Sequence, residues 1–176
     1  LLSNVRGASK NPGNYKRHQN YIGSSNEISF TPVPPDATEE YMANLEKYIH
    51  IESPRVLVQS AIMHAQFEMI HPFEDGNGRI GRLLIPLFLY YREILPYPTF
   101  YMSEFFEKDR NRYIEKLSNI SLLGDWRSWL VYYLEGVLSQ AKNNVQKANN
   151  LMNLYDDLKE KVRAINSKHA ISIIDY

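Results

Sequence analysis

Apolar residues recur every three or four positions along most of the chain, which is the spacing of one face of an α-helix. The first such face lies in a helix predicted to end near residue 52 and consists of Tyr41, Met42, Leu45, Tyr48 and Ile49. Asp36 would cap this helix, because a glutamate follows three residues later, as in a capping box. Ser53 and Pro54 then provide a cap and a first helical residue, which predicts a second helix up to Ile70.

The middle of the chain continues the helical pattern. The apolar run from Ile80 to Tyr91, which follows a cluster of glycines, predicts a third helix. After a break at two prolines, Ser103 and Asp109 offer caps for a short turn at residues 104–108 and a helix at residues 111–120.

Two helical stripes fill the last third of the chain. The first predicts core packing and consists of Trp126, Trp129, Leu130, Tyr133, Leu134 and Val137. The second, from Ser139 to Ile165, is longer and more polar. Its basic and acidic residues are interspersed, which is typical of a solvated face and not of a nucleic-acid-binding surface.

Residues 1–35 are rich in glycine and proline, and this composition argues against a regular helix there. Within them, residues 15–22 and 27–33 alternate enough to predict a short β-hairpin with residues 23–26 as its loop. The predicted fold class is therefore all-α, a helical bundle with a small β-hairpin. His64 lies on an otherwise apolar helix face, and we interpret it as a hydrogen-bonded core residue outside the functional site.

Composition narrows the class of protein. The 176 residues, 44% of them apolar, suffice for one globular domain with a substantial core. With 20 basic and 20 acidic side chains the formal charge is zero, so no global field favours nucleic acid or a membrane surface. The absence of cysteine fits a reducing, cytoplasmic compartment. No transmembrane segment or signal peptide is predicted, and the first residue, Leu1, suggests a piece of a longer protein.

One stretch, from His71 to Arg82, concentrates the chemistry: its sequence is His-Pro-Phe-Glu-Asp-Gly-Asn-Gly-Arg-Ile-Gly-Arg. Glycines let main-chain N–H groups approach an anion, and the following helix would point its positive N-terminus at it. A Rossmann loop would follow a buried strand, whereas a helix precedes this stretch. A P-loop ends in Gly-Lys-Ser/Thr, and the sequence contains no such tripeptide. An EF-hand loop needs Gly at its sixth position and Glu at its twelfth, with acidic or amide ligands at alternate positions, and the stretch does not match this spacing. With these three motifs excluded, the stretch is best interpreted as an anion-binding loop between two helices.

The stretch resembles the signature of the Fic (filamentation induced by cAMP) family, His-x-Phe-x-Asp/Glu-Gly-Asn-Gly-Arg-x-x-Arg, at every fixed position. The flanking helices and the stretch from Gln19 to Gly23 extend the likeness over about residues 10–140. The resemblance implies a Fic core over residues 1–140, with the hairpin at about 15–33 acting as a flap that positions a target protein. Residues 141–176 would form an amphipathic helix and the start of a truncated downstream domain, and nucleic acid would be bound only through such a missing domain.

The residues of the motif suggest individual roles. His71 is the candidate general base, because imidazole titrates near operating pH. Asp75 is the candidate Mg²⁺ ligand, since Mg²⁺ prefers oxygen ligands and keeps much of its hydration. The main chain of Gly76, Asn77 and Gly78, with the Asn77 side chain, would form an anion hole for the α- and β-phosphates. The resemblance implies that Arg79 supports the β-phosphate and that Arg82 meets the γ-phosphate, and Phe73 would anchor the loop in the core.

The resemblance implies a protein adenylyltransferase, which transfers AMP from ATP to a Ser, Thr or Tyr hydroxyl and releases pyrophosphate. Family variants that act as kinases carry lysine where this chain has Gly78. Two alternatives stay open: a nucleotide-binding regulatory module with weak turnover, and a transferase that uses another phosphodiester donor, such as UTP or CDP-choline. Self-modification and homo-oligomerisation are also left open.

Many Fic enzymes carry an inhibitory helix, Ser/Thr-x-x-x-Glu-Gly/Asn, whose glutamate pairs with the second motif arginine. The stretch from Ser103 to Glu107 has this spacing but continues with Lys108. We therefore expect no inhibitory helix within the chain, a free Arg82, and an inhibitory element upstream or on a partner chain.

Overall fold

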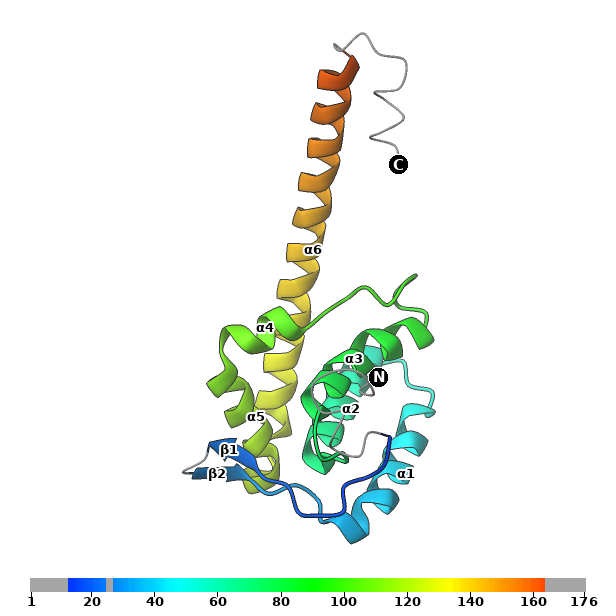
Figure 1. The fold of residues 1–176 in the computed structure, drawn as a ribbon. Helices are drawn as coiled ribbons and strands as arrows, with labels where there is room; N and C mark the ends of the chain where they lie inside the picture. Colours follow the sequence, from blue (N-terminus) through cyan, green and yellow to red (C-terminus); the bar gives the residue numbers. More distant parts are fainter. Residues whose placement is uncertain (1–12, 25–26, 164–176) are drawn as a thin grey trace. The chain divides into compact units, whose positions relative to one another are not determined.

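The computed structural model describes residues 13–24 and 27–163, and the chain is mostly helical over these residues (Figure 1). Its contacts divide it into two units, Leu1–Val137 and Leu138–Tyr176, and each is considered by itself. All residues that the sequence singled out for chemistry lie in the first, which we call the core unit. Among the described residues, no helix combines the length and the apolar character needed to cross a bilayer.

Three helices surround the motif: α1 (Thr38–Ile49), α2 (Val56–Ile70) and α3 (Asn77–Tyr91). α2 packs against both of the others (Figure 1). It is apolar nearly all round and accordingly buries most of its length, including Met63, Phe67 and Ile70. The predicted third helix is present, and it begins at Asn77, before the apolar run, which places its N-terminus beside the glycine-rich loop.

Two predicted helix starts were wrong. Asp36 does not cap α1, because it lies within a 3₁₀ turn, η1 (Pro35–Ala37), and the helix begins only at Thr38. The Thr38 hydroxyl donates to the carbonyl of Pro34, at 2.9 Å. α2 likewise begins at Val56 and not at Pro54, since the Ser53 hydroxyl accepts from the N–H of Arg55 in a local turn.

The second half of the core unit contains α4 (Ser103–Lys108), α5 (Arg110–Leu123) and the first part of α6 (Trp126–Arg163). Asp109 caps α5 as predicted, because its carboxylate accepts from the N–H of Arg112 at 3.0 Å. The two stripes of the last third form a single helix, α6. The predicted end of the second stripe at Ile165 and the predicted downstream segment lie outside the described residues.

The first of these stripes, which we call the aromatic stripe (Trp126 to Val137), packs into the core against α2, and its packing into the core was predicted. Trp129 and Tyr133 are fully buried, the Trp129 indole donates to the Ala61 carbonyl, and the Tyr133 hydroxyl bonds with Ser60. His64 lies in the same cluster and is also fully buried. Its Nδ1 donates to the carbonyl of Gly81 and its Nε2 accepts from the Tyr113 hydroxyl, both at 3.0 Å, which confirms a hydrogen-bonded core histidine.

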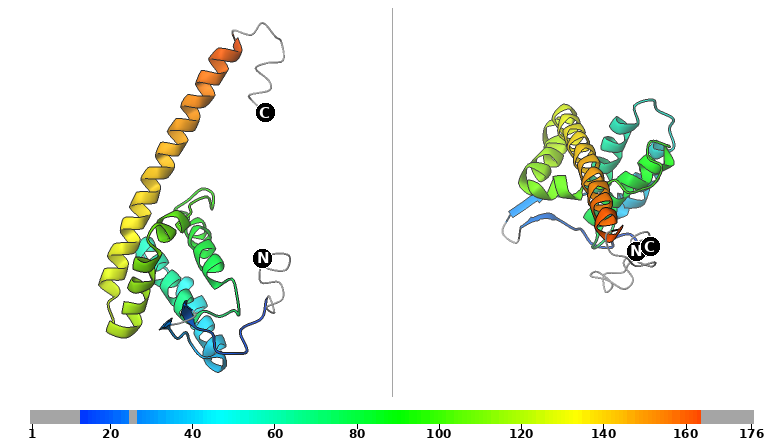
Figure 2. Two further views of the ribbon diagram at one scale, coloured as in Figure 1. Left: turned by 60° about the vertical axis from the view of Figure 1, so that its left-hand side comes forward. Right: turned by 90° about the horizontal axis from the view of Figure 1, so that it is seen from above.

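Two short strands, β1 (Ile22–Ser24) and β2 (Glu27–Phe30), pair antiparallel with an irregularity between Ile22 and Gly23. They lie at one edge of the helical core, near α5, and Figure 2 shows the same edge from two further sides. The pairing is shorter than the alternating pattern predicted. Most of residues 15–21 is irregular chain, because its polar groups bond to the motif loop, as described next.

Candidate active site

The loop between α2 and α3 has an unusual backbone. His71 ends α2 in the left-handed region, with φ 50° and ψ 60°, and Gly76 opens α3 with φ 85°. Glycine accepts this region freely, whereas a residue with a side chain is strained there by about 1–3 kcal/mol. The His71 backbone therefore needs support from its surroundings.

Residues of the N-terminal arm provide this support. The Lys16 main chain donates to the carbonyl of Pro72 at 2.8 Å, and its ammonium group donates to the carbonyl of Ile70 at 3.0 Å. Asn20 donates through Nδ2 to the carbonyls of His71 and Phe73, at 3.1 and 3.0 Å, and accepts from the Lys16 ammonium group. We call this set of bonds the arm clamp. Sequence reasoning missed it: Lys16 belongs to no local motif, and Asn20, although it lies in the stretch that extends the family likeness, was given no role there.

The His71 ring is held in a defined tautomer. Its Nδ1 lies 3.3 Å from the main-chain carbonyl of Glu68, and a carbonyl oxygen can only accept, so Nδ1 carries the proton and Nε2 keeps its lone pair. Burial lowers the pKa of His71 to about 4, with the nearby Lys16 charge acting in the same direction and the hydrogen bond to Glu68 opposing. The ring is therefore neutral at physiological pH and can accept a proton through Nε2.

The Asn77 side chain braces the motif loop. Asn77 is only 2% exposed, its Oδ1 accepts from the N–H of Phe73 at 2.8 Å, and its Nδ2 donates to the Phe73 carbonyl at 2.7 Å. These two bonds give the side chain a structural role that the sequence did not predict. The main-chain N–H groups of Asn77 and Gly78 remain, because the first turn of a helix lacks acceptors within the helix.

Phe73 anchors the loop as predicted. Its ring packs against the core and lies 6.4 Å from the ring of Phe67 on α2 and 6.1 Å from that of Tyr15 in the arm. The arm, the loop and the core thus meet at one aromatic contact, which fixes the position of the motif relative to α2.

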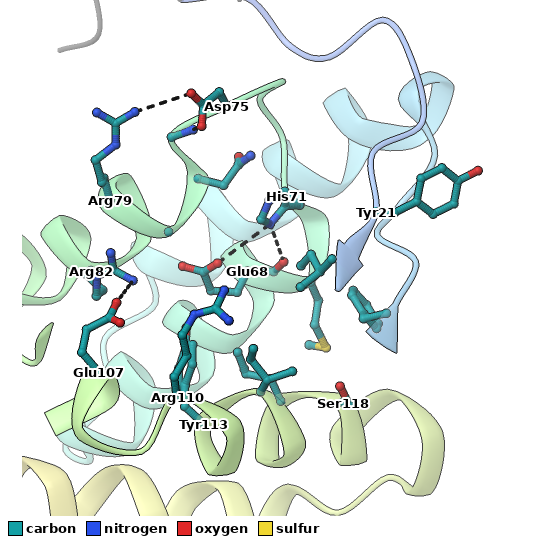
Figure 3. Close-up of a pocket in the computed structure, with 18 of the residues that line it drawn as sticks. Tyr21, Glu68, His71, Asp75, Arg79, Arg82, Glu107, Arg110, Tyr113 and Ser118 are labelled. Atoms are coloured by element: carbon teal, nitrogen blue, oxygen red, sulfur yellow. Dashed lines mark hydrogen bonds and ion pairs between the residues drawn. The ribbon is translucent and has the colours of Figure 1, made fainter. Parts of the chain in front are cut away.

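The charged motif residues point toward one cavity of about 570 Å³ (Figure 3). Its lining includes His71, the Asp75–Arg79 segment and Arg82, together with residues of the strands and of α5. Asp75 pairs loosely with Arg79, at 3.8 Å, and accepts from the N–H of Gly76. The structure thus brings together all of the site residues that the sequence predicted.

Arg82 is not free, contrary to the expectation from sequence. Its guanidinium lies 3.5 Å from the carboxylate of Glu107 on α4. The side chains of Arg82 and Glu107 are 23% and 54% exposed, so solvent screens the pair. The sequence contained the signal, since Glu107 has the Ser-x-x-x-Glu spacing, but the following Lys108 led us to reject it.

Asp75 fits a Mg²⁺ ion as a single protein ligand. Its carboxylate is 40% exposed at the cavity, and only one oxygen is committed to a hydrogen bond with Gly76. Mg²⁺ sites that act on nucleotides use one or two carboxylates with phosphate oxygens and water. No cluster of three or more potential metal ligands occurs within the described residues.

A glycine-rich loop between two helices, with a neutral histidine at its start, defines the candidate site of this helical domain. The chain belongs to the Fic/DOC family, whose model matches residues 1–89. It is 32% identical over 127 residues, or 68% of its length, to a protein adenylyltransferase of Caenorhabditis briggsae. It is 40% identical over 57 residues, or 32% of its length, to a probable protein adenylyltransferase of Aquifex aeolicus.

The chain spans only about a fifth of these two relatives, 22% and 18% of their lengths. Its fold resembles that of a Fic family protein from Desulfovibrio desulfuricans, with a TM-score of 0.72 and 24% identity over 96% of this chain and 52% of that one. A Fic-domain signaling protein from Bacteroides thetaiotaomicron gives a TM-score of 0.61 at 24% identity, covering 78% of this chain and 56% of that one.

Proposed function

We propose that this chain is a protein adenylyltransferase, which transfers AMP from ATP to a Ser, Thr or Tyr hydroxyl of a protein and releases pyrophosphate. The observation that carries the proposal is that His71, neutral and with Nε2 left as the proton acceptor, lines the same cavity as the first turn of α3. The relatives named as protein adenylyltransferases support it.

Each motif residue then has a chemical task. His71 accepts the proton of the attacking hydroxyl through Nε2. The N–H groups of Asn77 and Gly78 at the N-terminus of α3 hold the α- and β-phosphates, which favours the negative transition state, and Gly76 allows the left-handed turn that presents them. Arg79 supports the β-phosphate and Arg82 the γ-phosphate. Mg²⁺, held by Asp75, would neutralise phosphate charge when bound.

The target protein would dock beside the paired strands β1 and β2. Tyr21, Ile22 and Phe30 line the cavity, so a segment added to the strand edge would pass close to His71. Strand addition uses main-chain hydrogen bonds and tolerates different side chains. In this arrangement the hairpin serves as the flap, and a second copy of the chain is the first target to test. A reducing, ATP-rich cytoplasm is the proposed location.

The test is incubation with ATP labelled at the α- or γ-phosphate, with the protein itself and cell extract as acceptors. We expect the α-label to enter protein, the γ-label to leave as pyrophosphate, and His71→Ala to abolish labelling. Incorporation of the γ-label would indicate a kinase. Label from UTP or CDP-choline alone would reassign the donor, and ATP binding without any labelling would favour the regulatory module.

A further inference from the structure

Glu68 is a buried carboxyl group directly beneath the candidate base. It lies on α2, one turn before His71, and is 6% exposed. Its Oε2 lies 3.9 Å from Nδ1 of His71 (Figure 3), and its Oε1 has no hydrogen-bond partner among the described residues. Nδ1 thus faces both the main-chain carbonyl and the side-chain carboxyl group of the same residue.

The fold makes room for this carboxyl group. A side chain at Gly81 on α3 would collide with Oε1 of Glu68, so the close contact between the two helices depends on glycine there. A buried carboxyl group with an unpaired oxygen loses its hydration without full replacement, which is unfavourable for folding. A merely structural role would be met better by an apolar side chain, so the cost points to a role in the site.

Several charged and titratable groups surround Glu68. His71 is above it on the loop, Arg82 approaches from α3, and Tyr113 approaches from α5. Burial raises the pKa of Glu68 to about 7, and the charge of Arg82 acts in the opposite direction. Beyond these groups, Lys16 acts on His71, and Glu107 pairs with Arg82.

We propose that Glu68 is a positioning residue for His71: its main-chain carbonyl holds the ring at Nδ1, and its carboxylate, 3.9 Å from the same nitrogen, stabilises the imidazolium formed during transfer. The inference rests on the proposed function. In the step concerned, the target O–H bond breaks and its proton goes to Nε2, while the oxygen bonds to the α-phosphorus and the bond to pyrophosphate breaks. The new positive charge on the ring then faces the Glu68 carboxylate at Nδ1, and the imidazolium later returns its proton to solvent.

The first test compares the pH profile of AMP transfer in wild type, Glu68→Gln and Glu68→Asp. Because only ionised Glu68 stabilises the imidazolium, kcat of the wild type rises with pH through about 7. Glu68→Gln should lose this rise and lower kcat on the order of tenfold to a hundredfold, the range of a hydrogen bond to a charged group, with the Kd for ATP unchanged. Glu68→Asp should restore part of the rise.

Glu74→Gln is the matched control. Glu74 also lines the cavity and stands three residues after His71, as Glu68 stands three before. It should keep the wild-type pH profile. An unchanged profile in Glu68→Gln, or a parallel loss of ATP binding and kcat, would overturn the proposal, because either result would show that the carboxylate does not act on the base.

A second measurement needs no nucleotide. Diethyl pyrocarbonate acylates neutral imidazole, and peptide mapping reports the rate at His71. In the intact protein this rate should rise through about pH 7 as Glu68 ionises, and the rise should be absent in Glu68→Gln. A wild-type rate without this rise refutes the proposal whatever the variants do. A normal rise in a protein that transfers no AMP would instead reject the proposed function and leave the Glu68–His71 relation standing.

Discussion

Replacing Glu107 by glutamine should strengthen ATP binding by a small and calculable factor. The change removes the negative charge that lies 3.5 Å from Arg82 and keeps the shape of the side chain. Because Glu107 is 54% exposed, the ion pair belongs to the surface class, worth about 0.2–1 kcal/mol. A γ-phosphate that takes Arg82 must displace this pair. Since 1.36 kcal/mol corresponds to a factor of ten, Glu107→Gln should lower the Kd for ATP by at most about fivefold.

Calorimetric titration with ATP and AMP provides the assay. The gain should be confined to ATP, because AMP has no phosphate to reach Arg82, and it should shrink at high salt as screening increases. Glu115→Gln is the control, since Glu115 forms a similar pair with Lys116, at 3.7 Å and with 60% and 21% exposure, outside the cavity lining. An equal gain for AMP, or a gain well above tenfold, would refute the reasoning, because an exposed ion pair cannot hold that much free energy.

Three further predictions follow from the site. His71→Ala should abolish transfer and leave the Kd for ATP within about threefold, because a base acts on the attacking hydroxyl; calorimetry beside an activity assay tests this. Asp75→Ala should leave low activity that no longer responds to added Mg²⁺, and a normal Mg²⁺ titration would exclude Asp75 as the ligand. Glu68 should make folding stability depend on pH: its pKa is raised from 4.5 to about 7, so its stabilising contribution is complete below pH 4.5 and is lost as pH rises toward 7. Denaturation should therefore show Glu68→Gln gaining on wild type by up to about 3 kcal/mol between these pH values, and a constant difference would contradict the burial.

Local signals in the sequence were sufficient to predict helix ends and core faces that are determined by residues close together in the chain. The presence of α3 followed from the apolar run after the glycines, and the cap of α5 followed from Asp109, whose carboxylate has few competing partners. The aromatic stripe on α6 was assigned to the core because no other face of that segment could bury Trp129 and Tyr133. In these cases the neighbouring residues determine where a helix begins or which of its faces is buried.

Contacts between distant segments could not be predicted in this way. The side chain of Asn77 was expected to bind phosphate, but the turn from Phe73 brings two main-chain groups within its reach. Glu107 on α4 pairs with Arg82 on α3, and no local pattern indicates that these two helices bring the residues together. Lys16 lies 54 positions from the carbonyl to which it donates, and no pattern in a single sequence marks such a pair.

The arm clamp has a consequence for where the working domain begins. A protein trimmed to start at α1 would keep every motif residue and the aromatic core, but the left-handed turn at His71 would lose the bonds from Lys16 and Asn20. We therefore expect such trimming to reduce AMP transfer more than folding stability, because the lost bonds hold the motif loop and not the aromatic core. A peptide covering residues 13–20, supplied separately, should then restore part of the activity, since association would replace the covalent connection.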